Sequence, residues 1–260
     1  MTALLLALLV TASPTEPAGA PADTLTDGCQ KGVAAACTNL GLKYATGNGV
    51  ARDLVKAKAL YEKACDGHDA VGCNNLSNLL AGDPTTLPRA LELLASACSL
   101  GAGVACGNLG GRALLGLGVP QNLARAKELL ERGCALDAAD ACHNLGVAHE
   151  QALFGGKVDF RTARELYAKG CELGGVKACV NLGMIYEHAR GVPRDLKKAA
   201  GLYELGCTRA VGGDDLMACN DFANMLRTGR GVKKDEPRGR AMLESTCKAG
   251  LQQACVNLVE

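Results

Sequence analysis

Cysteine is the residue type whose number and spacing in this chain point most directly to chemistry. The fourteen cysteines form seven pairs that recur about every 36 residues, a period typical of helical repeats. Six pairs have seven residues between their two cysteines, one pair has eleven, and no cysteine is left over. In chain order the pairs are Cys29 with Cys37, Cys65 with Cys73, Cys98 with Cys106, Cys134 with Cys142, Cys171 with Cys179, Cys207 with Cys219 and Cys247 with Cys255.

Paired thiols can form disulfides, bind a metal ion or stay free in a core. Zinc sites favour cysteines two to four residues apart that converge from two segments, and the chain has no such cluster. Regular pairs of free thiols are not expected in a reducing compartment, where cysteines are seldom kept in such order. Metal ligands and buried free thiols stay open as alternatives, but the pattern favours seven disulfides and an oxidising compartment.

The spacing also predicts where the chain turns. Residues eight apart in one helix lie about 12 Å apart along its axis, whereas a disulfide needs Cα atoms within roughly 4.4–6.8 Å. The chain must therefore reverse between the cysteines, the first lying in the last turn of one helix and the second in the first turns of the next. A glycine suited to a left-handed helix stop follows most first cysteines: Gly32, Gly67, Gly101, Gly174 and Gly250.

The segments between the pairs are internal repeats. Repeat units start at residues 37, 73, 106, 142, 179 and 219, and each is expected to be a helix pair in a solenoid. A small residue recurs in the first helix, where a neighbouring helix must approach closely: Gly41, Ser77, Gly110, Gly146, Gly183 and Ala223. The second helix of each unit has a predicted N-cap residue: Asp53, Thr86, Asn122, Asp159, Asp195 and Asp235.

The ends of the chain differ from the repeats. Residues 3–10 are apolar and are followed by Ala18-Gly19-Ala20, so we expect a signal peptide over residues 1–20, with a disordered apolar tail as the alternative. Residues 21–28 are predicted to be a linker. The solenoid domain is expected over residues 29–260, with capping segments at 29–36 and 255–260.

The segment from Cys37 to Cys65 contains Cys-x-Asn-Leu-Gly-x-x-Tyr, then Gly-x-Gly-Val-x-x-Asp-x-x-Lys-Ala, then Tyr-x-Lys-Ala-Cys. This pattern resembles the Sel1-like repeat, a relative of the tetratricopeptide repeat, and the paired cysteines resemble those of the Helicobacter cysteine-rich proteins. The resemblance implies an all-α fold, a right-handed α/α solenoid of helix pairs stapled by disulfides. It also implies an interaction scaffold, although some cysteine-rich members are described as penicillin-binding with β-lactamase activity. A related protein works in mitochondrial respiratory-chain assembly.

The same resemblance implies that the first helices line a concave groove. The residue two positions after the second cysteine of each pair corresponds to a place where an asparagine often holds the main chain of a ligand. An amide side chain has a donor and an acceptor and can pair with one peptide unit. Alternatively, these amides bond to neighbouring helices and support the stack. The row is Asn39, Asn75, Asn108, Asn144, Asn181, Asp221 and Asn257.

Residues one, five, eight and nine positions after the same cysteine are expected to share this face. They vary between repeats, as residues that select a ligand would, and as ordinary solvated surface would. Four of them, His143, Glu187, Asn224 and Arg227, join the row as candidate peptide-binding residues. The others singled out are Asn74, Asn78, Glu150, His188 and Asn220.

Catalytic motifs are sparse. Ser245-Thr246-Cys247-Lys248 matches the Ser-x-x-Lys element of penicillin-recognising enzymes, but the Ser-Asp-Asn and Lys-Thr-Gly elements are missing. No histidine belongs to a His-Glu-x-x-His pair. The residues therefore predict no catalytic site, no metal ligand and no cofactor. If the chain has an activity, the resemblance implies β-lactam hydrolysis.

Charge and hydropathy limit the partners. With 28 basic and 27 acidic side chains, the chain has no basic footprint for nucleic acid. We expect a monomer with no membrane span in the mature chain, secreted or periplasmic, that binds a protein or peptide. The alternatives are a weak β-lactamase or penicillin-binding protein, and an assembly factor of the mitochondrial intermembrane space.

Overall fold

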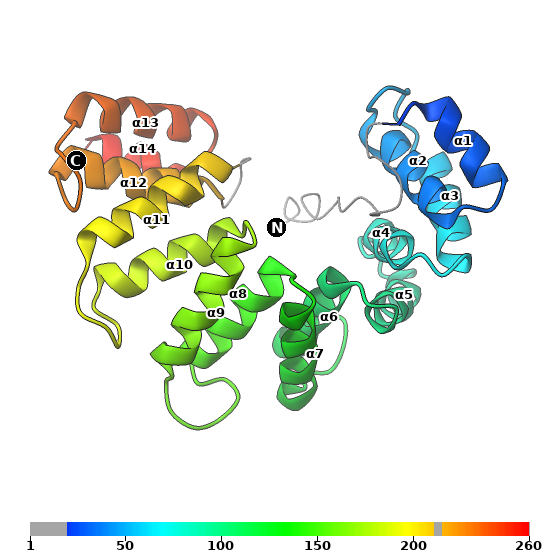
Figure 1. Cartoon of the computed structure of the whole chain (residues 1–260), viewed down its shortest axis with the longest axis horizontal. Coiled ribbons are helices and arrows are strands. Elements are labelled where there is room, and N and C mark those ends of the chain that lie inside the picture. The colour runs from blue at the N-terminus through cyan, green and yellow to red at the C-terminus, as the bar shows by residue number, and fades with distance from the viewer. Residues whose placement is uncertain (1–19, 211–214, 260) are drawn as a thin grey trace. The chain divides into compact units, whose positions relative to one another are not determined.

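The computed structural model describes residues 20–210 and 215–259, and the elements of these ranges are fourteen α-helices (Figure 1). They fall into an N-terminal unit and a C-terminal unit, divided between Leu136 and Asp137. The helices are α1 (Ala22–Gln30), α2 (Ala34–Thr46), α3 (Leu54–Asp66), α4 (Ala70–Leu80), α5 (Leu87–Ser99), α6 (Gly103–Leu115), α7 (Leu123–Ala135), α8 (Ala139–Glu150), α9 (Phe160–Glu172), α10 (Val176–Glu187), α11 (Leu196–Arg209), α12 (Leu216–Thr228), α13 (Glu236–Lys248) and α14 (Gln252–Val259).

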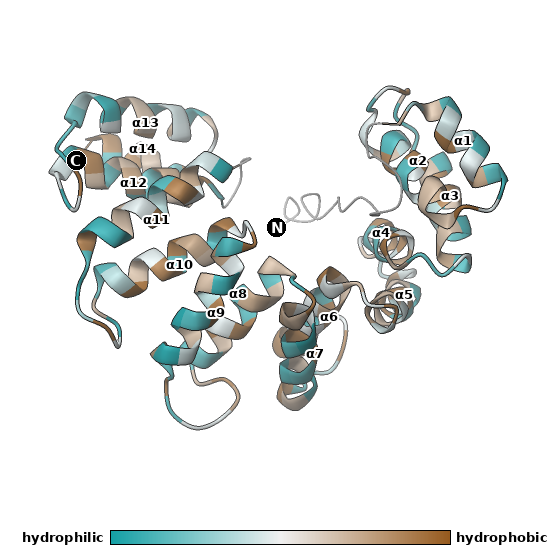
Figure 2. Ribbon diagram, in the orientation of Figure 1, coloured by the Kyte–Doolittle hydropathy of each residue, from teal (hydrophilic) through white to brown (hydrophobic). Residues whose placement is uncertain are grey.

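Each predicted repeat is a pair of packed helices, which confirms the predicted all-α solenoid fold. In the N-terminal unit α2 packs most extensively on α3, α4 on α5 and α6 on α7; in the C-terminal unit the pairs are α8 with α9, α10 with α11 and α12 with α13. Every helix carries both hydrophobic and hydrophilic residues (Figure 2). None of the described helices has the length and apolar character needed to cross a membrane.

Side-chain caps begin most of the second helices, as predicted. Asp53 accepts hydrogen bonds from the amides of Val55 and Lys56, both at 3.0 Å. Asn122, Asp159, Asp195 and Asp235 each accept one from the amide three residues on. Thr86 was wrongly predicted to do the same. Its backbone is helical and its hydroxyl donates instead to the Leu80 carbonyl at 2.7 Å, while Pro88 lies in the first turn of the helix.

The predicted disulfides join the end of one helix to the start of the next. Six of them have Cα–Cα distances of 4.4–4.8 Å. These six join Cys29 to Cys37, Cys65 to Cys73, Cys98 to Cys106, Cys171 to Cys179, Cys207 to Cys219 and Cys247 to Cys255. Cys134 and Cys142 are disulfide-bonded as well, and no cysteine is free. The alternatives of metal ligands and free thiols therefore fail.

The second cysteines differ in burial. Cys106 and Cys179 are completely buried near the start of their first helices, Cys106 in a cluster with Cys98 and Leu94 and Cys179 in a cluster with Cys171 and Ala178. Cys219 is only half-buried, and its pair is the one with the longer separation of 12 residues. The cysteines were predicted as disulfide partners, and this prediction is confirmed. Cys106, Cys179 and Cys219 are bonded to Cys98, Cys171 and Cys207 at the helix junctions, which gives them a structural role.

The chain reversals follow the predicted left-handed stop, with one correction. Gly32, Gly101, Gly174 and Gly250 have positive φ angles, but Gly67 does not, and His68 takes the left-handed conformation with φ of 62°. Gly67 is needed for another reason, because a Cβ there would lie 2.8 Å from the Cβ of Ala34.

The small residues of the first helices make room for large side chains of the second helices, as predicted. A Cβ on Gly41, Gly146 or Gly183 would lie 2.5–2.7 Å from a ring carbon of a tyrosine. These buried tyrosines are Tyr61, Tyr167 and Tyr203. At Gly110 the second helix presents Leu130. Four of the six helix pairs are thus fixed by one large side chain seated on a glycine, and the other two have Ser77 and Ala223 at this position.

The N-terminal segment corrects one expectation. Residues 21–28, predicted to be a linker, belong almost entirely to α1, which begins after Pro21 and buries Leu25 and Cys29 against α2. The apolar pair four residues apart supplies a face that can pack, and this outweighs the polar composition of the segment. The predicted signal peptide lies outside the described residues except for Ala20. At the other end, the capping segment is α14, which begins at Gln252.

Candidate functional site

The candidate peptide-binding residues lie on one side of the first helices, which we call the first-helix face. It comprises the positions one, two, five and eight after the second cysteine of each pair on α2, α4, α6, α8, α10 and α12, and the positions one and two after Cys255 on α14. The first turn of each of these helices is anchored by a disulfide, so the side chains that follow it start from a fixed point. This regular anchoring places the row residues at the same turn of successive helices within each unit.

In the N-terminal unit, Asn74, Asn75 and Asn108 of this face have buried amide atoms that form no hydrogen bond. Asn75 has an exposed fraction of 0%, and neither atom of its amide forms a hydrogen bond. The same holds for Oδ1 of Asn74 and Nδ2 of Asn108. The Tyr61 hydroxyl, close to Asn75, is also buried and without a hydrogen bond of normal geometry. Burial raises the pKa of Tyr61 far above its ordinary value, and the amide of Asn75 acts in the opposite direction.

In the C-terminal unit, the corresponding amides are linked across repeats. Nδ1 of His143 is 3.1 Å from Oδ1 of Asn144, and its Nε2 is 3.1 Å from Nδ2 of Asn181. An amide oxygen accepts and an amide NH2 donates, so the imidazole is the neutral Nδ1–H tautomer. This agrees with the lowered pKa of His143, whose main cause is burial, partly offset by the bond to Asn144. The imidazole thus bridges two row positions.

The next first helices repeat this arrangement with amides and a carboxylate. Nδ2 of Asn257 donates to Oδ1 of Asn220 at 2.7 Å, and Nδ2 of Asn220 donates to Oδ1 of Asp221 at 3.0 Å. Asn220 therefore occupies the same bridging position on α12 that His143 occupies on α8. Arg227, one of the predicted residues, donates to the backbone carbonyl of Asn257 and links α12 to α14.

Two carboxylates of the C-terminal unit sit between a tyrosine and an arginine. Glu150 accepts from the Tyr167 hydroxyl at 2.8 Å and forms an ion pair with Arg190. Glu187 accepts from the Tyr203 hydroxyl at 2.6 Å and forms an ion pair with Arg230. In each case the tyrosine and glutamate belong to one repeat and the arginine follows the first helix of the next. These Tyr–Glu–Arg clusters were not predicted.

Asp221 stands out electrostatically. It is the only row member with a carboxylate, and no described cation forms an ion pair with it. Burial raises its pKa to about 6, with a further contribution from the charge of Glu187. It faces a cavity of about 220 Å³ between α10 and α12. The cavity is lined by Met184, Glu187, His188, Tyr203, Asp221, Asn224, Met225 and Arg230.

The structure therefore brings together some predicted residues and leaves others apart. His143 joins Asn144 and Asn181; Asn220 joins Asp221 and Asn257; and the cavity collects Glu187, His188, Asn224 and Asp221. Asn39 is buried on α2, and Asn78 is half-buried on α4. Sequence reasoning missed the arginines, although both lie eleven residues after a second cysteine and could have been found by that spacing.

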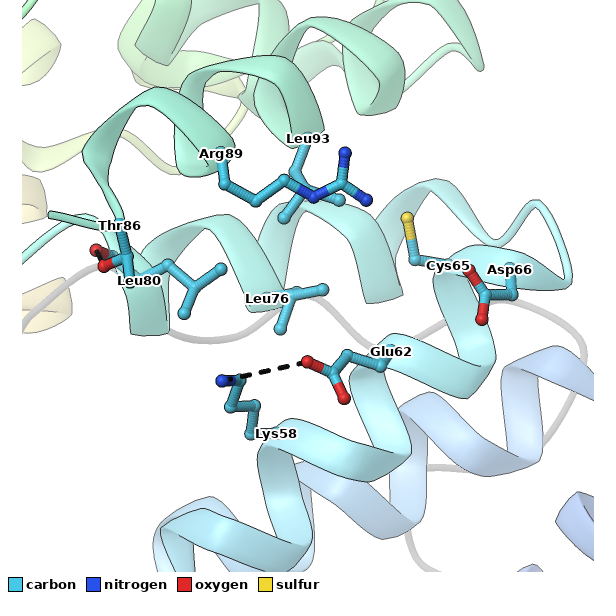
Figure 3. Close-up of a pocket in the computed structure, with 9 residues that line it drawn as sticks. All are labelled: Lys58, Glu62, Cys65, Asp66, Leu76, Leu80, Thr86, Arg89 and Leu93. Atoms are coloured by element: carbon cyan, nitrogen blue, oxygen red, sulfur yellow. Dashed lines mark hydrogen bonds and ion pairs between the residues drawn. The ribbon is translucent and has the colours of Figure 1, made fainter.

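A second hollow lies in the N-terminal unit, away from the row, and was also missed. A cavity of about 380 Å³ opens between α3 and α5, over Leu76 and Leu80 of α4 (Figure 3). Lys58 and Glu62 form an ion pair at 3.8 Å on one wall, and Arg89 stands on the other.

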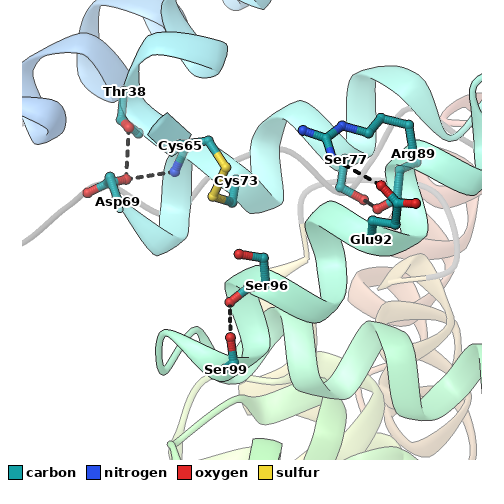
Figure 4. The surroundings of a disulfide bond; sticks show 11 residues. Thr38, Cys65, Asp69, Cys73, Ser77, Arg89, Glu92, Ser96 and Ser99 are labelled. Atoms are coloured by element: carbon teal, nitrogen blue, oxygen red, sulfur yellow. Dashed lines mark hydrogen bonds and ion pairs between the residues drawn. A yellow bond between two sulfur atoms is a disulfide. The ribbon is translucent and has the colours of Figure 1, made fainter. Parts of the chain in front are cut away.

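The Cys65–Cys73 disulfide lies at the edge of this hollow (Figure 4). Nearby, the Thr38 hydroxyl donates to Asp69 at 2.8 Å, and Asp69 accepts from the amide of Gly72 at 2.6 Å. The bridge and the capping aspartate together fix the start of α4 against α2. The disulfide is thus part of the packing between consecutive repeats.

The Ser-x-x-Lys match lies at the end of α13. Ser245 and Lys248 are exposed, and Cys247 between them is bonded to Cys255. The motif therefore sits on a disulfide-bonded helix end rather than at a cavity described above.

Comparison with known proteins places the chain in a family. The Sel1 repeat matches residues 34–69, 71–101, 103–137, 139–175, 176–210 and 216–251, so each match covers one helix pair. Cytochrome c oxidase assembly factor 7 of Xenopus tropicalis is 39% identical over 89 residues, which are 32% of this chain. The chain spans 38% of the length of that relative.

A solved structure has the same fold, and a second solved structure is similar in sequence. A Sel1 repeat protein from Oxalobacter formigenes has a TM-score of 0.75 at 20% identity, over 88% of this chain and 99% of that one. Cysteine-rich protein B of Helicobacter pylori is 28% identical over 53% of this chain and 96% of that one, with a TM-score of 0.42. With six matched repeats that cover most of its length and a disulfide at each helix junction, this chain belongs to the Sel1 repeat family.

Proposed function

We propose that this protein is a scaffold, secreted or periplasmic, that binds an extended segment of a partner protein on its first-helix face. Sel1 repeats are a family of protein-binding repeats, and the disulfides indicate an oxidising compartment. The observation that carries the proposal is the row of polar side chains, one per repeat, on the same turn of successive first helices. A regular row of this kind suits a ligand that is itself regular, such as an extended main chain.

The half-buried amides of the row keep hydrogen-bonding capacity. Asn144 uses its Oδ1 to accept from His143, which leaves its NH2 group to donate to a ligand. Asn181 uses its Nδ2 to donate to His143, which leaves its amide oxygen to accept from a ligand. Nδ2 of Asn108 is buried without a partner. A buried polar group without a hydrogen bond costs free energy, and a ligand main chain would recover it on a small movement of the Asn108 side chain toward the surface. These amides can therefore contribute to binding as well as to the links between helices.

The proposal can be tested with a defined unfolded ligand. We would measure the fluorescence anisotropy of a labelled, reduced and carboxymethylated protein on titration with the oxidised scaffold. The double variant Asn108→Ala with Asn144→Ala is expected to bind at least about tenfold more weakly, from the loss of two hydrogen bonds. The matched control is Lys58→Ala with Arg89→Ala, which changes exposed residues at the hollow between α3 and α5 and should bind as the wild type does.

Two results would count against this function. Unchanged affinity together with a lower free energy of unfolding would show that the amides only support the stack. Turnover of a chromogenic β-lactam by the same sample, with no binding of the unfolded ligand, would favour the enzymatic alternative.

A second candidate is an assembly factor of the mitochondrial intermembrane space. It is favoured by the 39% identity over 89 residues to a protein named as a cytochrome c oxidase assembly factor. The two candidates differ in compartment. Import of the labelled chain into isolated mitochondria, with protection from added protease, would support the second, whereas export to the periplasm or medium would support the first.

A further inference from the structure

The cavity between α10 and α12 differs from the rest of the row in charge. At the row position it has the carboxylate of Asp221, whereas the other repeats have an amide. Oδ1 of Asp221 accepts from Asn220, and no other hydrogen bond or ion pair to this carboxylate occurs among the described residues. Neighbouring Glu187 already binds Arg230 and the Tyr203 hydroxyl. The charge of Glu187 is therefore offset within the protein, whereas that of Asp221 is not.

We infer that this cavity binds a lysine or arginine side chain of the partner segment. Its volume of about 220 Å³ is below the roughly 300–1,000 Å³ of sites for drug-sized ligands, and it suits a single side chain. Met184 and Met225 provide apolar walls for an aliphatic stem, and Asp221 is the acceptor for the cationic end. With Arg230 and Glu187 paired, one positive charge balances the site. This inference rests on the proposed function, since it names the chemistry of the bound segment.

The preceding repeat supports the assignment by contrast. There the cluster of Tyr167, Glu150 and Arg190 is the same, but the row position holds Asn181, which is bonded to His143. The site at Asp221 therefore has one negative charge and one unoccupied acceptor that the position of Asn181 lacks, and its apolar wall has Met225 where the preceding repeat has Ile185. A basic side chain should enter only at this repeat, which would fix the register of a segment along the row.

The test compares peptides that differ in one side chain. Unstructured twelve-residue peptides of Gly, Ser and Ala would carry a single central lysine, arginine, norleucine or glutamate, and their affinities would be measured by fluorescence anisotropy. The wild type should bind the lysine and arginine peptides at least about tenfold more tightly than the norleucine peptide, from one charge-assisted hydrogen bond. Asp221→Asn, which restores the amide of the other repeats, should remove this preference, so that it binds the lysine, arginine and norleucine peptides with similar affinities. Equal affinity of the wild type for lysine and norleucine peptides would overturn the inference.

A second probe separates the cavity from the row. Titration of the labelled protein with N-acetyl-lysine methylamide should shift the NMR signals of Asp221 and Asn224 in the wild type but not in Asp221→Asn. If these shifts occur and no peptide binds, the cavity is correct and the proposed groove is wrong. If peptides bind but neither the preference nor the shifts occur, the groove is correct and the cavity assignment is wrong.

Discussion

In the C-terminal unit the Tyr167 and Tyr203 hydroxyls each donate to a glutamate that also binds an arginine of the next repeat, whereas in the N-terminal unit the Tyr61 hydroxyl has no such partner. One position of the repeat accounts for this difference between the tyrosines. Where Glu150 and Glu187 stand eight residues after the second cysteine, the repeat of Tyr61 has Ala45. Elsewhere in the N-terminal unit, Leu94 and Leu130 replace the tyrosine.

The amides of the first-helix face also form more hydrogen bonds in the C-terminal unit than in the N-terminal unit. Asn144, His143 and Asn181 form a bonded series in the C-terminal unit, while Asn75 of the N-terminal unit is buried without a hydrogen bond. On the first-helix face, the C-terminal unit therefore links its repeats through a series of polar side chains, whereas the N-terminal unit has the bond from Thr38 to Asp69 at the start of α4 together with apolar packing and disulfides. Both units have the disulfides. A comparison of the two units therefore distinguishes the contribution of a disulfide to stability from the contribution of the side-chain networks.

Removal of a disulfide should have the largest effect and should test this difference directly. Cys65→Ser with Cys73→Ser is expected to lower the free energy of unfolding by about 2–3 kcal/mol, because the unfolded chain gains freedom. The equivalent change, Cys171→Ser with Cys179→Ser, opens a loop of the same length but lies where side chains also link the repeats. Urea unfolding followed by circular dichroism should show the smaller loss for the second pair, and a larger loss there would contradict the comparison.

Removal of a clamping carboxylate comes next. Glu187→Ala leaves the buried end of Tyr203 and the charge of Arg230 without their acceptor, and should cost about 2 kcal/mol, since Arg230 is partly exposed. Exposed Glu165 on α9 provides the control, and Glu165→Ala should change stability by less than about 0.5 kcal/mol. Equal effects of the two variants in urea unfolding would mean that the cluster does not link the repeats.

The free energy of unfolding should depend on pH through the titration of Asp221. Its pKa is about 6 in the folded protein, above the ordinary 3.8, so the folded state binds the proton more tightly than the unfolded state. The stabilising contribution of the protonated group is present below pH 4 and is lost as the pH rises through 6. Asp221→Asn should therefore be more stable than the wild type by about 1–2 kcal/mol at pH 7.5, with discount for partial exposure, and nearly equal to it at pH 3.5. A constant difference across this range would exclude Asp221 as the titrating group.

The smallest effect should come from the tyrosine hydroxyls. Tyr203→Phe removes a hydrogen bond to Glu187 and is expected to cost about 1 kcal/mol. Tyr61→Phe removes a buried hydroxyl without a normal hydrogen bond, so it should be neutral or slightly stabilising. Thermal unfolding of the two variants measures both, and a loss in Tyr61→Phe as large as in Tyr203→Phe would show that Tyr61 has a partner in solution.

Most of the fold could be predicted because its signals are local. A cap residue such as Asp53 acts on the next three residues, a pair of cysteines fixes one reversal, and Gly41 marks one close contact. Thr86 shows the limit of such signals, since its hydroxyl bonds to a carbonyl of the preceding turn instead of the helix amides. The helix at Ala22–Gln30 was missed because two apolar residues, Leu25 and Cys29, were enough to pack it.

The candidate site was harder to predict because its contacts join different repeats. Glu150 and Arg190 are forty residues apart, and whether they meet depends on how one repeat is rotated on the next. The sequence showed that Asp221 departs from the row of asparagines, but not that Met184 and Met225 would leave a cavity in front of it. Spacing identifies the face, and only the packing of successive helices identifies the cavity.

The central claim is that the first-helix face binds the partner, and hydrogen–deuterium exchange of the oxidised protein tests it most directly. We would compare amide exchange with and without a saturating lysine-bearing unstructured peptide. Protection is expected on the first helices, with the strongest effect at the row residues of α10 and α12 and little change on α3, α5, α11 and α13. Protection confined to the second helices, such as the hollow between α3 and α5, would contradict the account.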